Sequence, residues 1–341
     1  KLITPIYREI MGMPEVKEDP AQTSGENCGQ PMNVSSIVLH EFSKRGYITM
    51  MAEDWMNGVF NWPGCKGFPT QPTTHYLRPF QTAYENSALI TDIQGKRNCF
   101  ETHHFLNDYF DQFVAAYPGA PKVALLWATE LGHGNAEIPF HADGEYRALF
   151  GRHQKEFDNS FLFFMGDHGP RLSAISRTVT GLRDQSNPLM MISIPRRLRK
   201  TTSILANLRA NGKKLLTHFD LYATFRDIAE SFAGAKEKTN FDKTEDKMGL
   251  MGTSLFRPLP AGSRTCKTLP IPLQYCLCKI DKARMEIEPK HFQIVELITN
   301  TINAQLSDNG FAKMCETLSP DQMISIERVM GSTALFDVTI R

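Results

Sequence analysis

The feature that most constrains the fold is an uninterrupted apolar run, FLFFM, at residues 161–165. Because apolar and polar residues do not alternate in it, the run predicts a strand buried on both faces, as in parallel sheets covered by helices. The chain then passes through Gly166 to Asp167, His168 and Gly169. We expect Gly169 to permit a sharp turn that directs the two polar side chains toward one point. Ligands of open α/β sheets bind beyond the carboxyl ends of the strands, so the run also predicts a site.

Segments of helix and strand type alternate through most of the chain. Ser35 or Ser36 is expected to cap the first helix, Gly46 to end it, and Thr217 to cap the last helix of the series. The other helices are expected at 36–45, 102–116 and 141–156. Strands are expected at 47–54, 122–129, 161–165 and 189–195. This alternation predicts an α/β fold with a doubly wound, mainly parallel sheet.

Three regions depart from this alternation. Residues 54–99 are rich in Pro, Gly, Asn and aromatic residues, which favours a long ordered loop of the kind that carries function. Residues 234–250 are charged and contain helix breakers, as in a flexible surface segment. Near the C-terminus, two helices at 289–306 and 319–330 and a strand at 334–340 predict a small α+β appendage. We therefore expect a main domain over 1–280 and an appendage over 281–341.

Composition excludes some classes of protein. The chain has 341 residues with 38 basic and 37 acidic side chains, a net charge of +1, so it lacks the charge excess that nucleic-acid binding requires. The basic segment at 195–200, PRRLRK, is typical of a solvated turn. No apolar run is long enough to span a bilayer. The chain starts at Lys1 without an initiator Met or a signal sequence, which we interpret as a cut.

The residues after two of the strands could form a chemical site. Asp167 and His168 suit a borderline cation such as zinc or manganese, although a capping Asp beside a surface His would give the same dipeptide. His133 follows another apolar strand and is expected at the same edge of the sheet, within reach of the same ion. Arg171 and Arg177 could hold phosphate or sulfate oxygens, or they could simply be surface arginines of a loop.

Several motifs then resemble one known family. They are FMGDHGPRL, the segment from Thr178 to Gly181 with Asp184 and Pro188, LTHFDLYATFRDI, AEDW with FPTQPTTHYLRPF, and GTSLFRP followed by RTC and YCLC. Together they resemble the animal sulfatase-like family called domain of unknown function 229, of the alkaline-phosphatase superfamily. The resemblance implies a metal-dependent hydrolase or transferase fold for phosphate or sulfate esters. It also implies an extracellular or secretory-pathway protein whose cysteines are mostly disulfide-bonded.

Carried over by resemblance, Asp167 and His168 match the superfamily's metal pair, and His133 matches a histidine that contacts substrate or metal. Where the family has Ser-His-Asp, this chain has Gly-His-Gly at 132–134, and the arginine of the following loop is displaced by one position to Arg177.

The N-terminal segment departs further from the family. KLITPIYREIMGM resembles the helix that follows the superfamily's first strand, so that strand and its acidic ligand are expected to be absent. The nucleophile position then falls near Leu2, with Thr4 as the nearest residue that carries a nucleophilic atom. At most half of a metal site would remain, and weak metal binding should follow.

Two classes of function are compatible with these features. The first is a zinc- or manganese-dependent phospho- or sulfoester hydrolase that is inactive in this N-terminally incomplete form. The second is a non-catalytic extracellular binding protein, a pseudoenzyme, on the same fold. Seven cysteines leave the redox state open, because buried reduced thiols of a cytosolic protein are the alternative to disulfides. We expect disulfides among Cys266, Cys276, Cys278 and Cys315 to join the main domain to the appendage.

Overall fold

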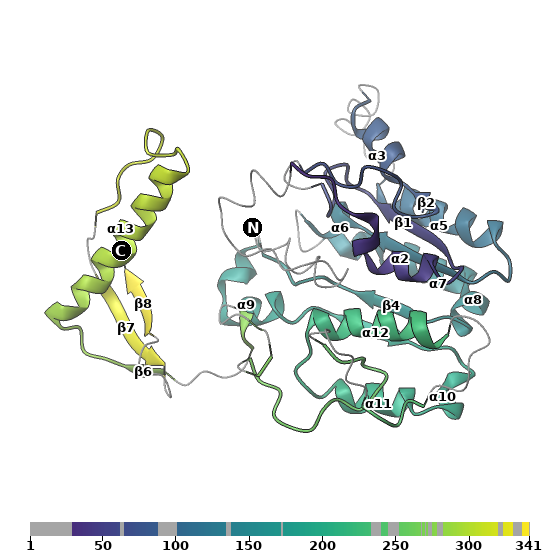
Figure 1. The fold of residues 1–341 in the computed structure, drawn as a ribbon. Coiled ribbons are helices and arrows are strands. Elements are labelled where there is room, and N and C mark those ends of the chain that lie inside the picture. Colours follow the sequence, from purple (N-terminus) through teal and green to yellow (C-terminus); the bar gives the residue numbers. More distant parts are fainter. Residues whose placement is uncertain are drawn as a thin grey trace. The chain divides into compact units, whose positions relative to one another are not determined.

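The structure is a computed structural model of the chain. It describes residues 29–61, 65–87, 101–133, 138–171, 173–232, 240–244, 252–266, 268–269, 271, 275–277, 282–319, 323–329 and 336–340. The chain divides into two compact units: unit 1 is Lys1–Leu277, and unit 2 is Cys278–Arg341 (Figure 1).

Unit 1 contains a parallel sheet of three strands in the order β2-β1-β3. The strands are β1 (Ile48–Glu53), β2 (His75–Tyr76) and β3 (Lys122–Trp127). β1 lies in the middle, with Met50 opposite both His75 and Ala124, and its four central residues are buried. The strands expected at 47–54 and 122–129 are therefore present, and they are parallel as predicted.

The next two expected strands form a pair of their own. They are β4 (Leu162–Met165) and β5 (Met190–Ser193), which pair antiparallel with Phe163 opposite Ile192. Phe164 is 37% exposed and Met191 58% exposed. The prediction of a parallel strand buried on both faces is wrong here. One face of β4 packs into the core, whereas Phe164 on the other face is partly exposed and forms T-shaped ring contacts with Tyr146 and Phe150.

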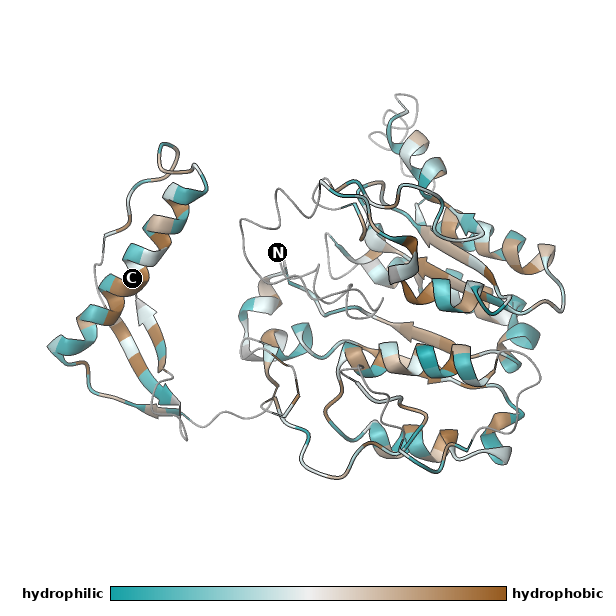
Figure 2. Ribbon diagram, viewed as in Figure 1, coloured by the Kyte–Doolittle hydropathy of each residue, from teal (hydrophilic) through white to brown (hydrophobic). Residues whose placement is uncertain are grey.

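Helices cover these strands on both faces. On one face, α2 (Val38–Ser43) and α12 (His218–Ser231) share a single buried cluster with Met51 of β1, Val123 of β3 and Phe163 of β4. On the other face, α5 (His103–Ala116) packs Leu106 and Phe113 against β1. Figure 2 shows brown, hydrophobic strands and helices that mix brown with teal. The two sheets of unit 1 therefore share one core.

The remaining helices of unit 1 connect these elements. They are η1 (Val34–Ser36), α3 (Arg78–Glu85), α6 (Thr129–His133), η2 (Ile138–Ala142), α7 (Asp143–Arg152), α8 (Gln154–Asp158), η3 (Ala174–Arg177), α9 (Val179–Gln185), α10 (Leu198–Thr201) and α11 (Ile204–Asn211).

Several expected boundaries need correction. The first helix begins after Ile37 rather than at a serine cap, and it ends before Gly46, whose φ of +81° only glycine adopts readily. The helix expected at 141–156 is two helices, because the backbone at His153 leaves the helical range. The expected loop at 54–99 contains β2 and α3. Of the expected surface segment at 234–250, only 240–244 lie within the described residues.

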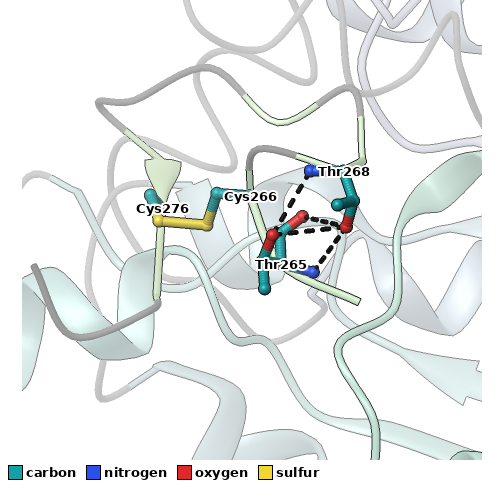
Figure 3. The surroundings of a disulfide bond; sticks show 4 residues. All are labelled: Thr265, Cys266, Thr268 and Cys276. Atoms are coloured by element: carbon teal, nitrogen blue, oxygen red, sulfur yellow. Dashed lines mark hydrogen bonds between the residues drawn. A yellow bond between two sulfur atoms is a disulfide. The ribbon is translucent and has the colours of Figure 1, made fainter. Parts of the chain in front are cut away.

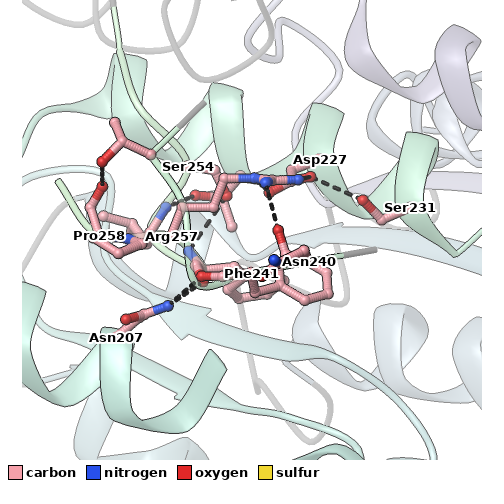
Figure 4. Close-up of polar contacts among 12 residues, drawn as sticks. Asn207, Asp227, Ser231, Asn240, Phe241, Ser254, Arg257 and Pro258 are labelled. Atoms are coloured by element: carbon pink, nitrogen blue, oxygen red, sulfur yellow. Dashed lines mark hydrogen bonds and ion pairs between the residues drawn. The ribbon is translucent and has the colours of Figure 1, made fainter. Parts of the chain in front are cut away.

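Helix α12 is tied to the C-terminal motifs by a buried ion pair. The Arg257 guanidinium donates two hydrogen bonds to Asp227, of 2.8 and 3.0 Å, and a third to the carbonyl of Asn240. It also stands 5.2 Å from the ring centre of Phe241. Figure 4 shows this network beside the helix. The arginine of the motif GTSLFRP is therefore a structural residue.

The observed disulfides differ from the expected ones. Cys266 bonds Cys276 within unit 1 (Figure 3), and Cys65 is also disulfide-bonded. Cys315 in unit 2 is a free, exposed thiol, and Cys278 lies outside the described residues. The prediction that Cys315 helps to join the two domains is wrong. The Cys266–Cys276 bond closes a loop inside unit 1 instead.

Unit 2 is an antiparallel sheet with one long helix. The strands β6 (Lys282–Arg284), β7 (Met323–Val329) and β8 (Phe336–Ile340) pair in the order β6-β7-β8. The turn η5 (Pro289–His291) leads into α13 (Phe292–Asp308), and Val295 of this helix packs against Met323 and Ile326. The prediction of a helix at 319–330 is wrong, because β7 occupies residues 323–329 of that range. Ile326 of this strand lies in the core of unit 2, and its β-branched side chain favours a strand. The strand expected at 334–340 is present as β8.

In the part of the chain that the structure describes, no helix combines the length and the apolar character that crossing a membrane requires.

Candidate functional site

The loop after β4 places Asp167 and His168 against each other. His168 Nδ1 lies 2.7 Å from the carbonyl oxygen of Gly169, so this nitrogen carries the proton that the carbonyl accepts. His168 Nε2 lies 3.1 Å from Asp167 Oδ2, and that buried oxygen receives no well-aligned hydrogen bond from the part of the chain that the structure describes. Histidines that bind metals in proteins usually donate their other ring N–H to a carbonyl or carboxylate, as His168 does. In the neutral ring, Nε2 and Oδ2 would be two electron-pair donors facing a common point.

Gly169 positions this pair, although for a different reason from the one expected. Its φ is not positive, so no left-handed turn requires a glycine there. Instead, a Cβ at this position would stand 2.2 Å from the backbone oxygen of Asp184, and the Gly169 amide donates a hydrogen bond to the carbonyl of Gln185. Gly169 is needed because the loop and the end of α9 touch backbone to backbone.

The same loop holds two further buried polar atoms that have no hydrogen-bond partner among the residues that the structure describes. They are Arg171 Nε and the hydroxyl of Ser173. The Ser176 hydroxyl folds the loop back by donating to the carbonyls of Arg171 and Ser173. Arg177, the other expected anion contact, is exposed at the end of η3. Buried polar atoms without partners are rare and commonly mark a place where a water, ion or ligand binds.

His133 lies at the exposed end of α6, where its ring stacks at an angle on Trp55 with the centres 5.7 Å apart. In Figure 1, α6 and α9, which follow β3 and β4, lie at the left of unit 1, whereas α5 and α8, which precede these strands, lie at the right. His133 is therefore on the expected end of the strands. No three metal-binding side chains among the described residues could share one ion, however, so Asp167, His168 and His133 do not form the expected group.

Two carboxyls at the end of β1 form a second polar group. Asp54 is fully buried and accepts hydrogen bonds from the amides of Thr129 and Glu130 and from the hydroxyl of Thr102. Glu53 accepts from the Val59 amide and the Thr129 hydroxyl. Burial raises the pKa of Glu53 to about 8 and that of Asp54 to about 6. This pair fixes the start of α6, and its place in the motif AEDW was the only sign of it in the sequence.

A third histidine touches the pair from another element. His218, the first residue of α12, lies with Nε2 3.1 Å from the backbone oxygen of Asp167. The carbonyl can only accept, so Nε2 is the donor. Burial lowers the pKa of His218, which keeps its ring neutral. Sequence reasoning identified only the capping role of the neighbouring Thr217, which the structure confirms as a capping box with Asp220.

The expected nucleophile position lies outside the described residues. Leu2 and Thr4 precede the first described residue, and Gly134 of the Gly-His-Gly departure lies in a separate stretch, 134–137, that is also outside the described residues. The role of Thr4 therefore stays a prediction.

Comparisons with known proteins agree with the resemblance at the level of the family. No curated protein and no solved structure matches the chain. One family model, described as protein of unknown function (DUF229), matches residues 11–324. Because this match spans most of the sequence, including the Asp167–His168 loop and the α12 motif, the chain belongs to the DUF229 family.

Proposed function

We propose that the chain carries the divalent-cation site of a phospho- or sulfoester hydrolase, on a fold of the alkaline-phosphatase and sulfatase type, and that the chain itself does not turn over these esters. The observation that carries the proposal is the placement of Asp167 Oδ2 and His168 Nε2, 3.1 Å apart, with the other ring nitrogen held by a backbone carbonyl. A carboxylate with a neutral imidazole suits zinc or manganese.

The Asp167 carboxylate and the His168 ring could supply two ligands of a divalent cation. Asp167 and His168 would hold the ion, which would act as a Lewis acid toward an ester oxygen. The Arg171 N–H and the Ser173 hydroxyl are buried donors in the same loop and would bind the other, negatively charged oxygens. A substrate with a tetrahedral anionic group fits this combination of acceptors and donors.

A second candidate function is a binding protein without catalysis. The observation that favours it is that the described residues bring only two metal-binding side chains together at this loop. A site with two ligands could therefore recognise an anion or a cation weakly and turn nothing over. An extracellular or secretory-pathway location is part of both proposals, and the Cys266–Cys276 disulfide supports it.

The test compares Asp167→Asn with Asp158→Asn, a control that changes an aspartate just before the same strand. Asp158 pairs with Arg196 and does not belong to the Asp167–His168 loop. Zinc and manganese binding is measured by calorimetry, and hydrolysis is measured with an aryl phosphate and an aryl sulfate. The proposal expects cation binding to disappear in Asp167→Asn alone, and it expects no hydrolysis by the wild type or by either variant. Hydrolysis by the wild type that is lost in Asp167→Asn would show that the chain is an active enzyme, and a wild-type chain without affinity for either cation would contradict the metal site.

A further inference from the structure

We propose that His218 is a positioning residue for the Asp167–His168 pair, and that Arg264 acts on the pair through it. The inference rests on the proposed function only for the identity of the cation. The contacts of His218 that carry it do not depend on that function. It assigns a role to the start of α12 and to the motif RTC.

The contact of His218 falls on the peptide unit that joins the two proposed ligands. The backbone oxygen of Asp167 belongs to the planar unit between Asp167 and His168, and His218 Nε2 donates to this oxygen. The orientation of this plane determines where the Cα–Cβ bonds of both residues point. The next peptide unit is held by the Gly169 amide, which donates to Gln185 at 3.0 Å. Both peptide units are thus anchored by other elements.

His218 is itself held by a buried network at the start of α12. Asp220 is 1% exposed, and its carboxylate accepts from the Thr217 amide at 2.8 Å and from the Thr253 amide at 2.9 Å. The same carboxylate pairs with Arg264, whose Nε also donates to the carbonyl of Leu215 at 2.7 Å. Arg264 therefore contacts a residue on each side of His218, Leu215 before it and Asp220 after it.

The anchor of Arg264 is the disulfide loop that follows it. Cys266 is bonded to Cys276, and hydrogen bonds between Thr265 and Thr268 close the turn beside the bond (Figure 3). Hydrogen bonds thus lead from this loop through Arg264 and Asp220 to Thr217, and the next residue in the chain, His218, contacts the Asp167 carbonyl.

The same helix offers a matched control. Arg257 pairs with Asp227 through a buried, bidentate contact like that of a structural ion pair. Asp227 lies about two and a half turns of α12 beyond His218, toward the other end of the helix. Loss of the Arg257 pair should reduce global stability, whereas loss of the Arg264 pair should also disturb the Asp167–His168 loop.

The experiment compares four single variants of the full chain: His218→Phe, His218→Gln, Arg264→Met and Arg257→Met. The glutamine amide keeps an N–H donor within reach of the carbonyl, and phenylalanine removes it. One readout is the zinc dissociation constant, and the other is the hydrogen-exchange rate of the Gly169 amide. His218→Phe and Arg264→Met are expected to weaken zinc binding by about 10- to 100-fold and to speed this exchange. His218→Gln and Arg257→Met are expected to stay near wild type in both readouts.

The outcomes separate this inference from the proposed function. Wild-type exchange and zinc affinity in His218→Phe would overturn the positioning role, as would an equal loss in His218→Gln. If the wild-type chain binds no zinc, the proposed function fails, and the exchange rate alone decides the role of His218. If His218→Phe does not fold, His218→Asn replaces it, because its shorter amide does not reach the carbonyl.

Discussion

Glu53 is a carboxyl whose pKa, raised to about 8 by burial, keeps it protonated at neutral pH. A group whose pKa is raised on folding binds its proton more tightly in the folded state. Folding stability is then greatest at low pH and falls as the pH rises from the unfolded pKa, about 4.5, to the folded one. Asp54 acts in the same direction over a lower range that ends at about 6.

We therefore expect the free energy of unfolding to decrease between pH 5 and pH 8, by an amount on the order of a few kcal/mol. Glu53→Gln should flatten this dependence, because the amide does not ionise. Urea unfolding at several pH values measures it, with the exposed Glu156→Gln on α8 as the control. An unchanged slope in Glu53→Gln would show that this carboxyl does not carry the effect.

Single residues also show what the sequence could predict about the site. Asp167 and His168 are adjacent and follow an apolar run, so their place at a strand end could be predicted. The bond from His218 to Asp167 joins positions 51 residues apart, and the bond from Thr129 to Asp54 joins positions 75 apart. Such contacts depend on how the helices pack, which no local pattern encodes. Ser173 gave no signal, because a buried serine without a partner is defined only by its folded surroundings.

At the scale of elements, an apolar run predicts a strand but not the direction of its neighbour. The run at 161–165 was consistent with a parallel strand covered on both faces, and β4 instead pairs antiparallel with β5. Helices with caps and periodic apolar residues were predicted more securely, as α12 and α5 show. A helix was expected where β7 lies. Met323 and Ile326, three positions apart, are both buried in this strand, and the irregular pairing between Met323 and Ser325 allows that spacing.

The Arg257–Asp227 pair should stabilise α12 against unit 1. Arg257→Met leaves the Asp227 carboxylate buried without its partner, which costs about 3–5 kcal/mol when one member of a buried pair is removed. The double variant Arg257→Met with Asp227→Leu should recover most of this loss, since neither charge then remains. Urea unfolding of the single and double variants tests this. A double variant no more stable than the single one would contradict the ion-pair explanation.

At the scale of the whole molecule, the two units have separate cores, and that of unit 2 is small. We expect unit 2 to unfold first in a thermal scan, because few buried side chains oppose its chain entropy. Ile326→Ala should lower only this transition, and Leu106→Ala only that of unit 1. Both side chains are fully buried, and such truncations cost about 2–5 kcal/mol.

Differential scanning calorimetry measures both transitions on the full chain. The Cys266–Cys276 bond lies within unit 1 and should not couple the two. A single transition that shifts equally in the two variants would show that the units unfold together.

The close backbone contact of Gly169 changes how mutational tolerance should be interpreted in this chain. A Cβ at Gly169 would overlap Asp184, and one at Gly252 would stand 2.2 Å from the backbone of Phe219, next to the start of α12. In a scan of all substitutions, both glycines are expected to tolerate change as poorly as Asp167, although neither has a side chain that could bind a cation. A functional screen alone would therefore score both glycines as active-site residues. Separate measurements of cation affinity and of folding would distinguish a residue that binds the cation from a glycine that is needed because a side chain would clash with the backbone.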